Sequence, residues 1–147
     1  MDDKKILVDP PLYLVSTVDS CWKCRSSMPV ICLIASNAQD SAFLLSNIIS
    51  LPPHVQSFIQ IRFPTFKLTY SKMAQNEYYA NTCPKCLVLS GDFHLHSEPD
   101  SPFFSISEDD ARRLTIEEIP LDRSIEVNAG FSTGGYVQFI LQHGKRG

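Results

Sequence analysis

The stretches Cys21-Trp22-Lys23-Cys24 and Cys83-Pro84-Lys85-Cys86 decide how this chain folds. Each places two thiols two residues apart, so that one tight turn aims both sulfurs at a single metal ion. Four thiolates from two such turns form a closed tetrahedral site, for which Zn²⁺ is the usual occupant. Such a site has no position open to water or substrate, which marks it as structural rather than catalytic. The predicted zinc ligands are Cys21, Cys24, Cys83 and Cys86.

The residues on either side of the two cysteine pairs predict two hairpins. Leu12–Val18 is an extended run that leads into the first pair, and Pro29–Ala35 is a continuous apolar run typical of a strand buried on both faces. Glu77–Thr82 leads into the second pair, and Leu87–His96 follows as a strand with a bend at Gly91. A strand, a CxxC turn and a second strand form a hairpin with the metal at its tip, an arrangement known as a zinc knuckle.

Three segments have features of short helices. Apolar residues recur at roughly helical spacing in Asn37–Leu51, and two prolines end that pattern. His54–Arg62 is predicted as a further helix, with Pro53 in its first turn. Ser107–Asp110 resembles a helix start, because its acidic residues suit the positive end of a helix dipole.

The remaining apolar runs predict strands. Phe66–Tyr70 alternates as a strand, and Ile125–Val127 and Tyr136–Leu141 are predicted as two strands joined through Gly130–Gly135. Together these segments predict an α+β fold with a small mixed sheet, two zinc-knuckle hairpins and two or three short helices. We expect residues 1–147 to form a single zinc-stabilised domain.

Composition restricts the classes of function. With 147 residues, 44% of them hydrophobic and 20% charged, the chain has the composition of a globular domain. The net charge of −3 argues against non-specific nucleic-acid binding, which relies on a basic surface. No secretory signal is recognisable, and the longest apolar run, near Val30–Ala35, has the length of a strand. Five cysteines in such a chain predict reduced metal ligands in the cytoplasm, and disulfides of a secreted protein are the alternative.

Four motifs follow one another in a recognisable order: Cys21-Trp22-Lys23-Cys24, Tyr79-Ala80-Asn81-Thr82-Cys83-Pro84-Lys85-Cys86, Gly91-Asp92-Phe93-His94-Leu95 and Glu98-Pro99-Asp100-Ser101-Pro102-Phe103-Phe104. This order resembles that of a group of small, uncharacterised bacterial proteins with a zinc-ribbon-like core. The resemblance covers about residues 15–106 and implies a zinc-ribbon element and a bacterial origin, without an activity. Zinc ribbons usually carry glycine just after the second cysteine pair, where this chain has Leu87.

A second group of metal-ligating residues is His94, His96 and Glu98. Alternate side chains of an extended segment share a face, so two imidazoles and a carboxylate would lie together. Such a set holds iron or catalytic zinc with open positions, which makes a metalloenzyme one alternative function. The other interpretation is the polar face of a half-buried strand. No phosphate-binding loop, GxSxG or HExxH motif supports an enzyme.

Basic and aromatic residues within the cysteine turns allow a nucleic-acid-binding zinc-ribbon regulator as another alternative. Lys23, Arg25 and Lys85 are cationic, and Trp22 offers a ring for stacking on a base. The alternative is that these lysines fit the turns and interact with the charge of four thiolates. Trp22 and the pair Tyr78-Tyr79 are also predicted to pack around the metal site. Cys32, within an apolar run, is predicted to be a buried structural thiol.

The preferred function is a non-enzymatic protein-interaction module, specifically an immunity protein that neutralises a basic bacterial toxin. Small size, acidic charge and the absence of catalytic motifs favour this class. Complementary charge speeds the encounter with a basic partner and selects it. A solvated helix face is the alternative interpretation of the same acidic stretch. The predicted partner-binding residues are Glu108, Asp109, Asp110, Glu117, Glu118 and Asp122.

Overall fold

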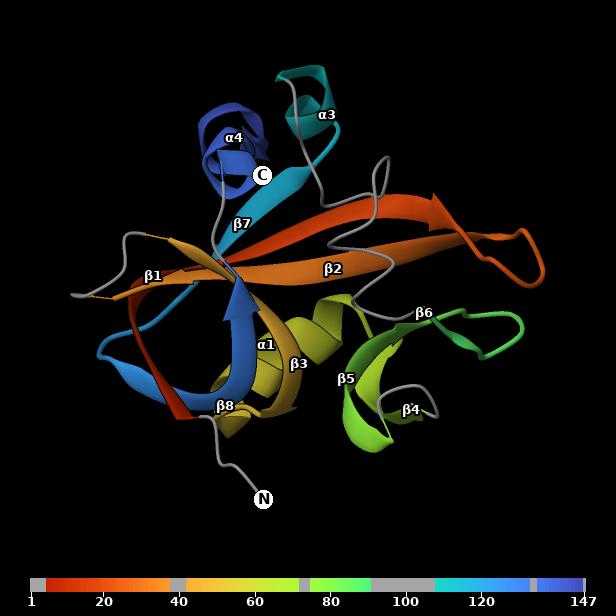
Figure 1. Cartoon of the computed structure of the whole chain (residues 1–147), viewed down its shortest axis with the longest axis horizontal. Helices are drawn as coiled ribbons and strands as arrows, with labels where there is room; N and C mark the ends of the chain where they lie inside the picture. Colours follow the sequence, from red (N-terminus) through yellow and green to blue (C-terminus); the bar gives the residue numbers. More distant parts are fainter. Residues whose placement is uncertain (1–4, 38–41, 72–74, 91–107, 133–134, 147) are drawn as a thin grey trace.

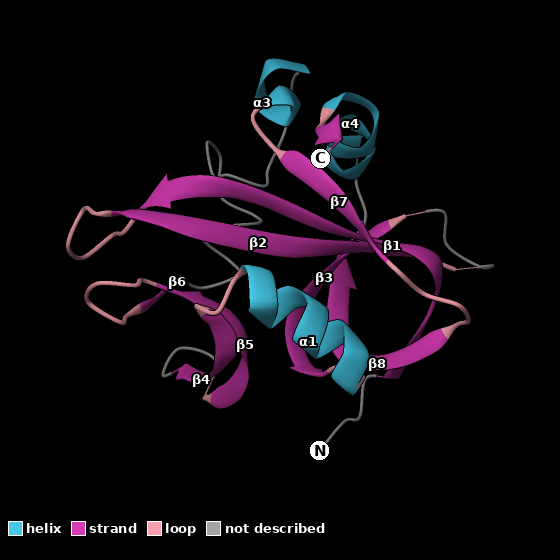
Figure 2. Ribbon diagram, turned by 180° about the vertical axis from the view of Figure 1, so that it is seen from behind, coloured by secondary structure: helices cyan, strands magenta, loops and turns pink. Residues whose placement is uncertain are grey.

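A computed structural model describes residues 5–37, 42–71, 75–90, 108–132 and 135–146. These residues form a strand-rich α+β fold, so the predicted fold class is confirmed at this level (Figures 1 and 2). The elements are β1 (Lys5–Ser20), β2 (Ser27–Ser36), β3 (Phe43–Ser50), α1 (Pro53–Arg62), β4 (Phe66–Ser71), β5 (Asn76–Thr82), β6 (Leu89–Ser90), α3 (Glu108–Arg112), β7 (Thr115–Ile119), β8 (Ile125–Ser132), α4 (Gly135–His143) and β9 (Lys145–Arg146).

The long strand β1 organises the larger sheet, whose strand order is β2-β3-β8-β1-β7-β9. One edge of β1 pairs with β8 near its start and with β7 further along, while its other edge pairs with β2. Because β2 also pairs with β3 and β3 with β8, the antiparallel pairings close into a four-strand circuit. The register of β1 against β2 shifts between Asp9 and Tyr13, where Pro10 and Pro11 lack the N–H groups that a ladder requires.

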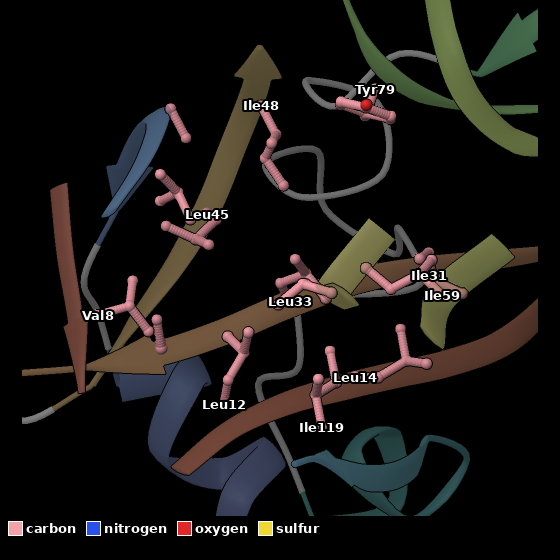
Figure 3. Packing of buried hydrophobic residues seen from close by; sticks show 14 of the residues in the cluster. Val8, Leu12, Leu14, Ile31, Leu33, Leu45, Ile48, Ile59, Tyr79 and Ile119 are labelled. Atoms are coloured by element: carbon pink, nitrogen blue, oxygen red, sulfur yellow. The ribbon is translucent and has the colours of Figure 1, made fainter. Parts of the chain in front are cut away.

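The apolar run of β2 is buried on both faces, as its sequence predicts. Ile31 and Leu33 point into a core cluster that also holds residues of β3, α1 and β5 (Figure 3). Val30, Cys32 and Ile34 point into a second cluster, which holds residues of β7 and α4. Alternating side chains therefore serve two cores, and this explains why no polar residue interrupts the strand.

A smaller sheet, of order β4-β5-β6, packs against the first core cluster through Phe66 and Tyr79, whose rings are stacked with centroids 5.9 Å apart. Asn81 of β5 joins this sheet to β2. Its buried side-chain amide accepts a hydrogen bond from the N–H of Ile31 at 2.8 Å and donates one to the carbonyl of Ile31 at 3.0 Å. The amide thus imitates a paired strand residue, and it satisfies two backbone groups that would otherwise be buried unpaired.

Helix α1 agrees with its prediction, but the helix expected over Asn37–Leu51 is wrong where that segment is described. Residues 43–50 form strand β3. Asn47 has a left-handed φ of 47°, and the register against β8 shifts between Ser46 and Ser50. This irregularity places Leu45 and Ile48, three residues apart, in the same core cluster. A bulged strand therefore imitates helical spacing.

The strand predicted over Tyr136–Leu141 is also wrong, because these residues lie in α4. Val137 and Ile140 are fully buried in the second cluster, the i, i+3 pattern of one helix face. The helix ends at His143, and at the next residue, Gly144, an added Cβ would lie 2.5 Å from Cδ1 of Ile116. The apolar composition of the segment alone does not distinguish a short helix from a strand.

Strand β7 was not predicted, whereas β4, β5 and β8 occur where strands were expected. The strand predicted over Leu87–His96 is described as far as Ser90, and within this part Leu89–Ser90 form strand β6. Residues 91–107 lie outside the described residues. No helix in the described part of the chain is long and apolar enough to cross a membrane.

We expect Asn81→Ala to lower the free energy of unfolding by about 2–4 kcal/mol, because it leaves the N–H and carbonyl of Ile31 buried without partners. Urea denaturation of the metal-loaded protein measures this loss. Asn76→Ala, in the same strand but exposed, is the matched control and should cost less than about 1 kcal/mol. Equal effects of the two substitutions would contradict the role given to Asn81.

Candidate metal centre

The two cysteine turns lie side by side at the ends of the two sheets (Figures 1 and 2). The first cysteine turn, residues 21–26, connects β1 to β2 directly after the pair Ser20–Ser27. The second cysteine turn, residues 83–88, connects β5 to β6 directly after the pair Thr82–Leu89. Each hairpin therefore presents its turn at the end of a paired ladder, and the ladders set the direction in which the sulfurs point.

The two turns share one hydrogen-bond pattern. In the first, the N–H of Cys21 donates to the carbonyl of Ser26 at 2.8 Å, and the N–H of Arg25 donates to the carbonyl of Cys21 at 3.0 Å. In the second, Cys83 with Val88 and Leu87 with Cys83 form the equivalent bonds at 2.9 and 3.0 Å. The related local sequences therefore fold into two copies of the same turn.

All four predicted ligands come together. The sulfurs of Cys21 and Cys86 are 3.5 Å apart, those of Cys24 and Cys83 are 3.6 Å apart, and all four lie within 4.8 Å of one another. A tetrahedral site with metal–sulfur bonds of about 2.3 Å has sulfur–sulfur edges of about 3.8 Å. The sulfurs are therefore spaced to hold one metal ion, and the cysteines carry free thiols.

The centre has a buried side and an exposed side. Cys21 and Cys83, the first cysteine of each turn, are buried and belong to the second core cluster together with Met28. Cys24 is exposed and Cys86 is partly exposed. A metal held there would seal the end of the core on one side, while the other side remains accessible for loading.

Hydrogen bonds toward sulfur favour the thiolate form that a metal requires. The N–H of Lys23 lies 3.4 Å from the sulfur of Cys21, and the N–H of Lys85 lies 3.4 Å from that of Cys83. A hydrogen bond from the backbone N–H of Cys24 is the largest cause that lowers the pKa of Cys21. The donors therefore suit a metal–thiolate centre.

The outer cysteines differ in protonation. Hydrogen bonds from the hydroxyl and then the backbone N–H of Ser26 lower the pKa of Cys24 to about 6. The N–H of Val88 also favours the thiolate of Cys86, but burial and the neighbouring thiols outweigh it and raise the pKa of Cys86 to about 11. The opposite directions of these shifts favour the thiolate more at Cys24 than at Cys86, and metal binding to the cluster would displace the protons that its thiols still carry.

Both turns contain a residue with left-handed backbone directly after the second cysteine. Arg25 has a φ of 65° and Leu87 a φ of 68°. Glycine adopts this conformation without steric cost, whereas a residue with a Cβ pays about 1–2 kcal/mol. Leu87, which stands where zinc ribbons usually have glycine, thus adopts the left-handed conformation under strain, and the turn keeps its geometry.

Trp22 links the two turns although its ring is 59% exposed. Its indole N–H donates a 2.9 Å hydrogen bond to the carbonyl of Leu89, which follows the second turn. Tyr78 and Tyr79 are buried, and Tyr79 packs in the first core cluster, away from the cysteines. The predicted packing around the metal site is therefore wrong for Tyr79, and Trp22 contributes one hydrogen bond across the turns.

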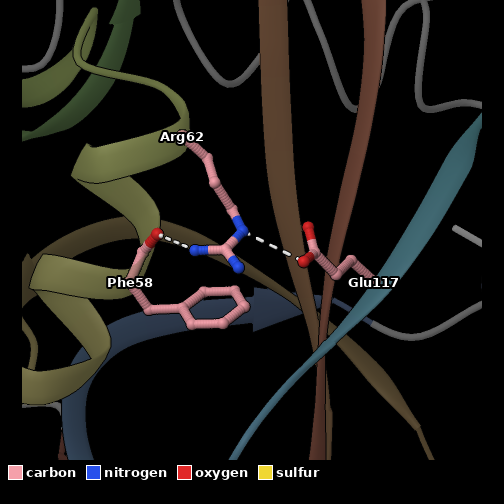
Figure 4. Close-up of polar contacts among 3 residues, drawn as sticks. All are labelled: Phe58, Arg62 and Glu117. Atoms are coloured by element: carbon pink, nitrogen blue, oxygen red, sulfur yellow. Dashed lines mark hydrogen bonds and ion pairs between the residues drawn. The ribbon is translucent and has the colours of Figure 1, made fainter.

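The predicted acidic partner-binding residues lie on α3, on β7 and in the loop after β7. Asp109 is on α3, with an ion pair to Arg112 at 3.2 Å. Glu117 and Glu118 are successive residues of β7, so their side chains leave opposite faces of the strand. Figure 4 shows Glu117 bound at 3.0 Å to Arg62 of α1, whose guanidinium also lies 3.6 Å from the centre of the Phe58 ring.

The other members of this acidic set are placed in less detail. Asp122 follows β7 and lies 3.5 Å from Arg123. Glu108 and Asp110 belong to α3, and their side chains lie outside the described part of the structure. His94, His96 and Glu98, the second predicted group of ligands, also lie outside the described residues.

Two residues that support the centre were not predicted. Asn81 lies two residues before Cys83 and ties β5 to β2. Ser26 donates to Cys24. A polar residue directly after the apolar residues Tyr78-Tyr79-Ala80 was the available signal for Asn81, whereas only the folded turn reveals the hydrogen bond of Ser26.

Comparisons with protein-family models, with curated proteins and with solved structures gave no match to this chain. Its function is therefore argued from its own residues.

We expect Leu87→Gly to raise the free energy of unfolding by about 0.5–1 kcal/mol, because relief of the left-handed strain exceeds the added chain entropy of glycine. Thermal melting of the metal-loaded protein measures the gain. Leu68→Gly, at an exposed position in the middle of strand β4, is the matched control and should instead be destabilising. A lower melting temperature for Leu87→Gly would contradict the strain assigned to this position.

Proposed function

We propose that the four cysteines bind one Zn²⁺ whose role is structural. The observation that carries this proposal is the spacing of the four sulfurs, which matches a tetrahedral thiolate site. Thiolates select soft or borderline metals, and four of them leave no coordination position for water or substrate. In this proposal the two hairpins form a zinc-ribbon-like unit, in keeping with the resemblance of their motifs to small bacterial proteins of that kind.

The zinc proposal predicts about one zinc per chain, and chelation should unfold or loosen the protein, since structural zinc sites contribute about 10 kcal/mol or more. Metal analysis by mass spectrometry, together with a melting curve in the presence of chelator, measures both effects. The double variant Cys83→Ser, Cys86→Ser should lose the zinc. Cys32→Ala is the control and should retain it, because Cys32 lies in the strand β2 and outside the cysteine group. Full zinc content in the double variant would refute the site.

We further propose that the protein is a non-enzymatic interaction module of the bacterial cytoplasm, and specifically an immunity protein. Two features support this proposal. A metal site closed by four sulfurs holds the fold together and leaves the surface free for recognition. In addition, Asp109, Glu118 and Asp122 are exposed carboxylates on α3, on β7 and after β7, and they suit a basic partner such as a nucleic-acid-acting toxin.

Charge reversal tests the acidic surface. We expect Asp109→Lys combined with Glu118→Lys to slow association with the toxin, and the difference from wild type should shrink as salt is raised, because screening removes long-range steering. The partner is first isolated by pull-down from native lysate, and rates are then measured by surface plasmon resonance. Glu126→Lys, an exposed change on β8, is the matched control. An unchanged association rate would argue against this surface.

A nucleic-acid-binding regulator remains the second candidate, and one observation favours it. Trp22 is exposed beside Lys23, and Arg25 and Lys85 are exposed on the same two turns. Aromatic and basic side chains together bind single strands. Retention of an oligonucleotide that is lost on Lys23→Ala and Lys85→Ala would support this candidate over the interaction module.

A further inference from the structure

Five exposed residues surround the cysteine cluster and form a surface that, apart from the hydrogen bond of the Trp22 indole to Leu89, makes no side-chain contact that the fold or the metal site requires. We call it the tip surface, and its members are Trp22, Lys23, Arg25, Lys85 and Leu87. Each lies next to one of the four cysteines in the sequence, and the sulfur contacts between the turns bring them to one end of the molecule. Trp22 is 59% exposed and Leu87 is 67% exposed.

The backbone of the tip surface is strained to carry side chains that the fold does not use. Arg25 and Leu87 occupy equivalent left-handed positions of the two turns, where glycine would be less costly. Leu87 is largely exposed, so its burial in this chain cannot offset the cost. When an exposed residue has a strained backbone and its side chain makes no stabilising contact within the chain, we interpret the strain as serving a contact with another molecule.

Trp22 is held in place as an anchor. Its indole N–H already donates to the carbonyl of Leu89, which fixes the ring across both turns and uses its only donor. The exposed remainder of the ring is therefore apolar. A rigid aromatic side chain loses little entropy on binding, which is typical of residues that dominate protein interfaces.

The charge of the tip surface defines its partner. The two turns carry Lys23, Arg25 and Lys85 and contain no carboxylate. With zinc bound, however, the four thiolates leave the centre with two negative charges, and the whole chain has a net charge of −3. Binding to a polyphosphate chain needs many uncompensated cations. A few separate cations around apolar side chains instead suit a protein segment with individual carboxylates.

We propose that the tip surface binds a protein segment in which an apolar side chain is flanked by carboxylates. Trp22 and Leu87 would contact the apolar side chain, and Arg25 with the two lysines would pair with the carboxylates. This inference rests on the proposed role in protein interaction, but it places a contact on a different face and with a partner of opposite charge from the acidic residues of α3 and β7.

The probe is a library of displayed 12-residue random peptides, selected on the zinc-loaded full chain. We expect enriched peptides in which an apolar residue is flanked by Asp or Glu. Synthetic versions without tryptophan are then titrated, and Trp22, the single tryptophan of the chain, reports binding by a blue shift of its emission. Leu87→Gly and Arg25→Gly should each weaken binding about tenfold, as truncation of central interface residues does, while the melting temperature rises. Leu68→Ser, exposed on β4, is the control and should bind normally.

Three outcomes would overturn the inference. If the peptides bind the Leu87→Gly and Arg25→Gly variants as tightly as wild type, they contact another face. The tip surface would then not be the binding site, but the proposed protein-interaction function would stand. Enrichment of basic peptides that are lost on Asp109→Lys with Glu118→Lys would likewise assign binding to the acidic residues alone. If no peptide is enriched and a thymidine 12-mer shifts the Trp22 emission, both this inference and the protein-interaction function are wrong.

Discussion

Closure of two distant cysteine turns on one centre is the constraint on which the rest of this structure depends. The turns are separated by 58 residues of sequence, which include β2, β3, α1, β4 and β5. Bringing them together costs loop entropy, and the cost grows only slowly with length. Binding of one metal ion by the four sulfurs can offset this entropy cost, because the free energy of metal binding becomes free energy of folding. In the proposed metal-bound state the smaller sheet would thereby be held against β2.

The cysteine cluster is not the only contact that joins the two sheets. Asn81 bonds both backbone groups of Ile31, and the indole of Trp22 bonds the carbonyl of Leu89, so polar contacts reinforce the junction on either side of the cysteines. The buried sulfurs of Cys21 and Cys83 continue the second apolar cluster. Because β2 has one core on each face, a shift of this strand would disturb both cores and the metal centre together.

The proposed separation of stability from recognition accounts for the chemistry of the surface. A metal held by all four sulfurs would keep the turns rigid, and rigid turns can display side chains that a flexible loop would have to order on binding. The exposed cations and apolar groups lie around the cysteines, while the exposed carboxylates of α3 and β7 lie on other elements. Some of those carboxylates are engaged within the chain, as Glu117 is by Arg62. The molecule therefore has two surfaces of opposite character rather than one uniform acidic face.

The local sequence was sufficient to predict the cysteine ligands, the burial of β2 on both faces and the start of α1 at Pro53, because spacing, apolar runs and proline act within a few residues. The local sequence was insufficient to predict strand β3 and helix α4. A bulge at Asn47 gives a strand the spacing of a helix, and the apolar residues of α4 fit either period. Only the tertiary structure decided these cases: strand partners supply the hydrogen bonds that β3 cannot form by itself, and the second core cluster buries Val137 and Ile140 on one face of α4. The same holds for β7, whose acidic residues are accommodated once Ile116 and Ile119 are buried beside β1. The tertiary structure also placed Trp22 and Leu87 on one exposed surface, since their proximity results from the meeting of two turns that the sequence separates.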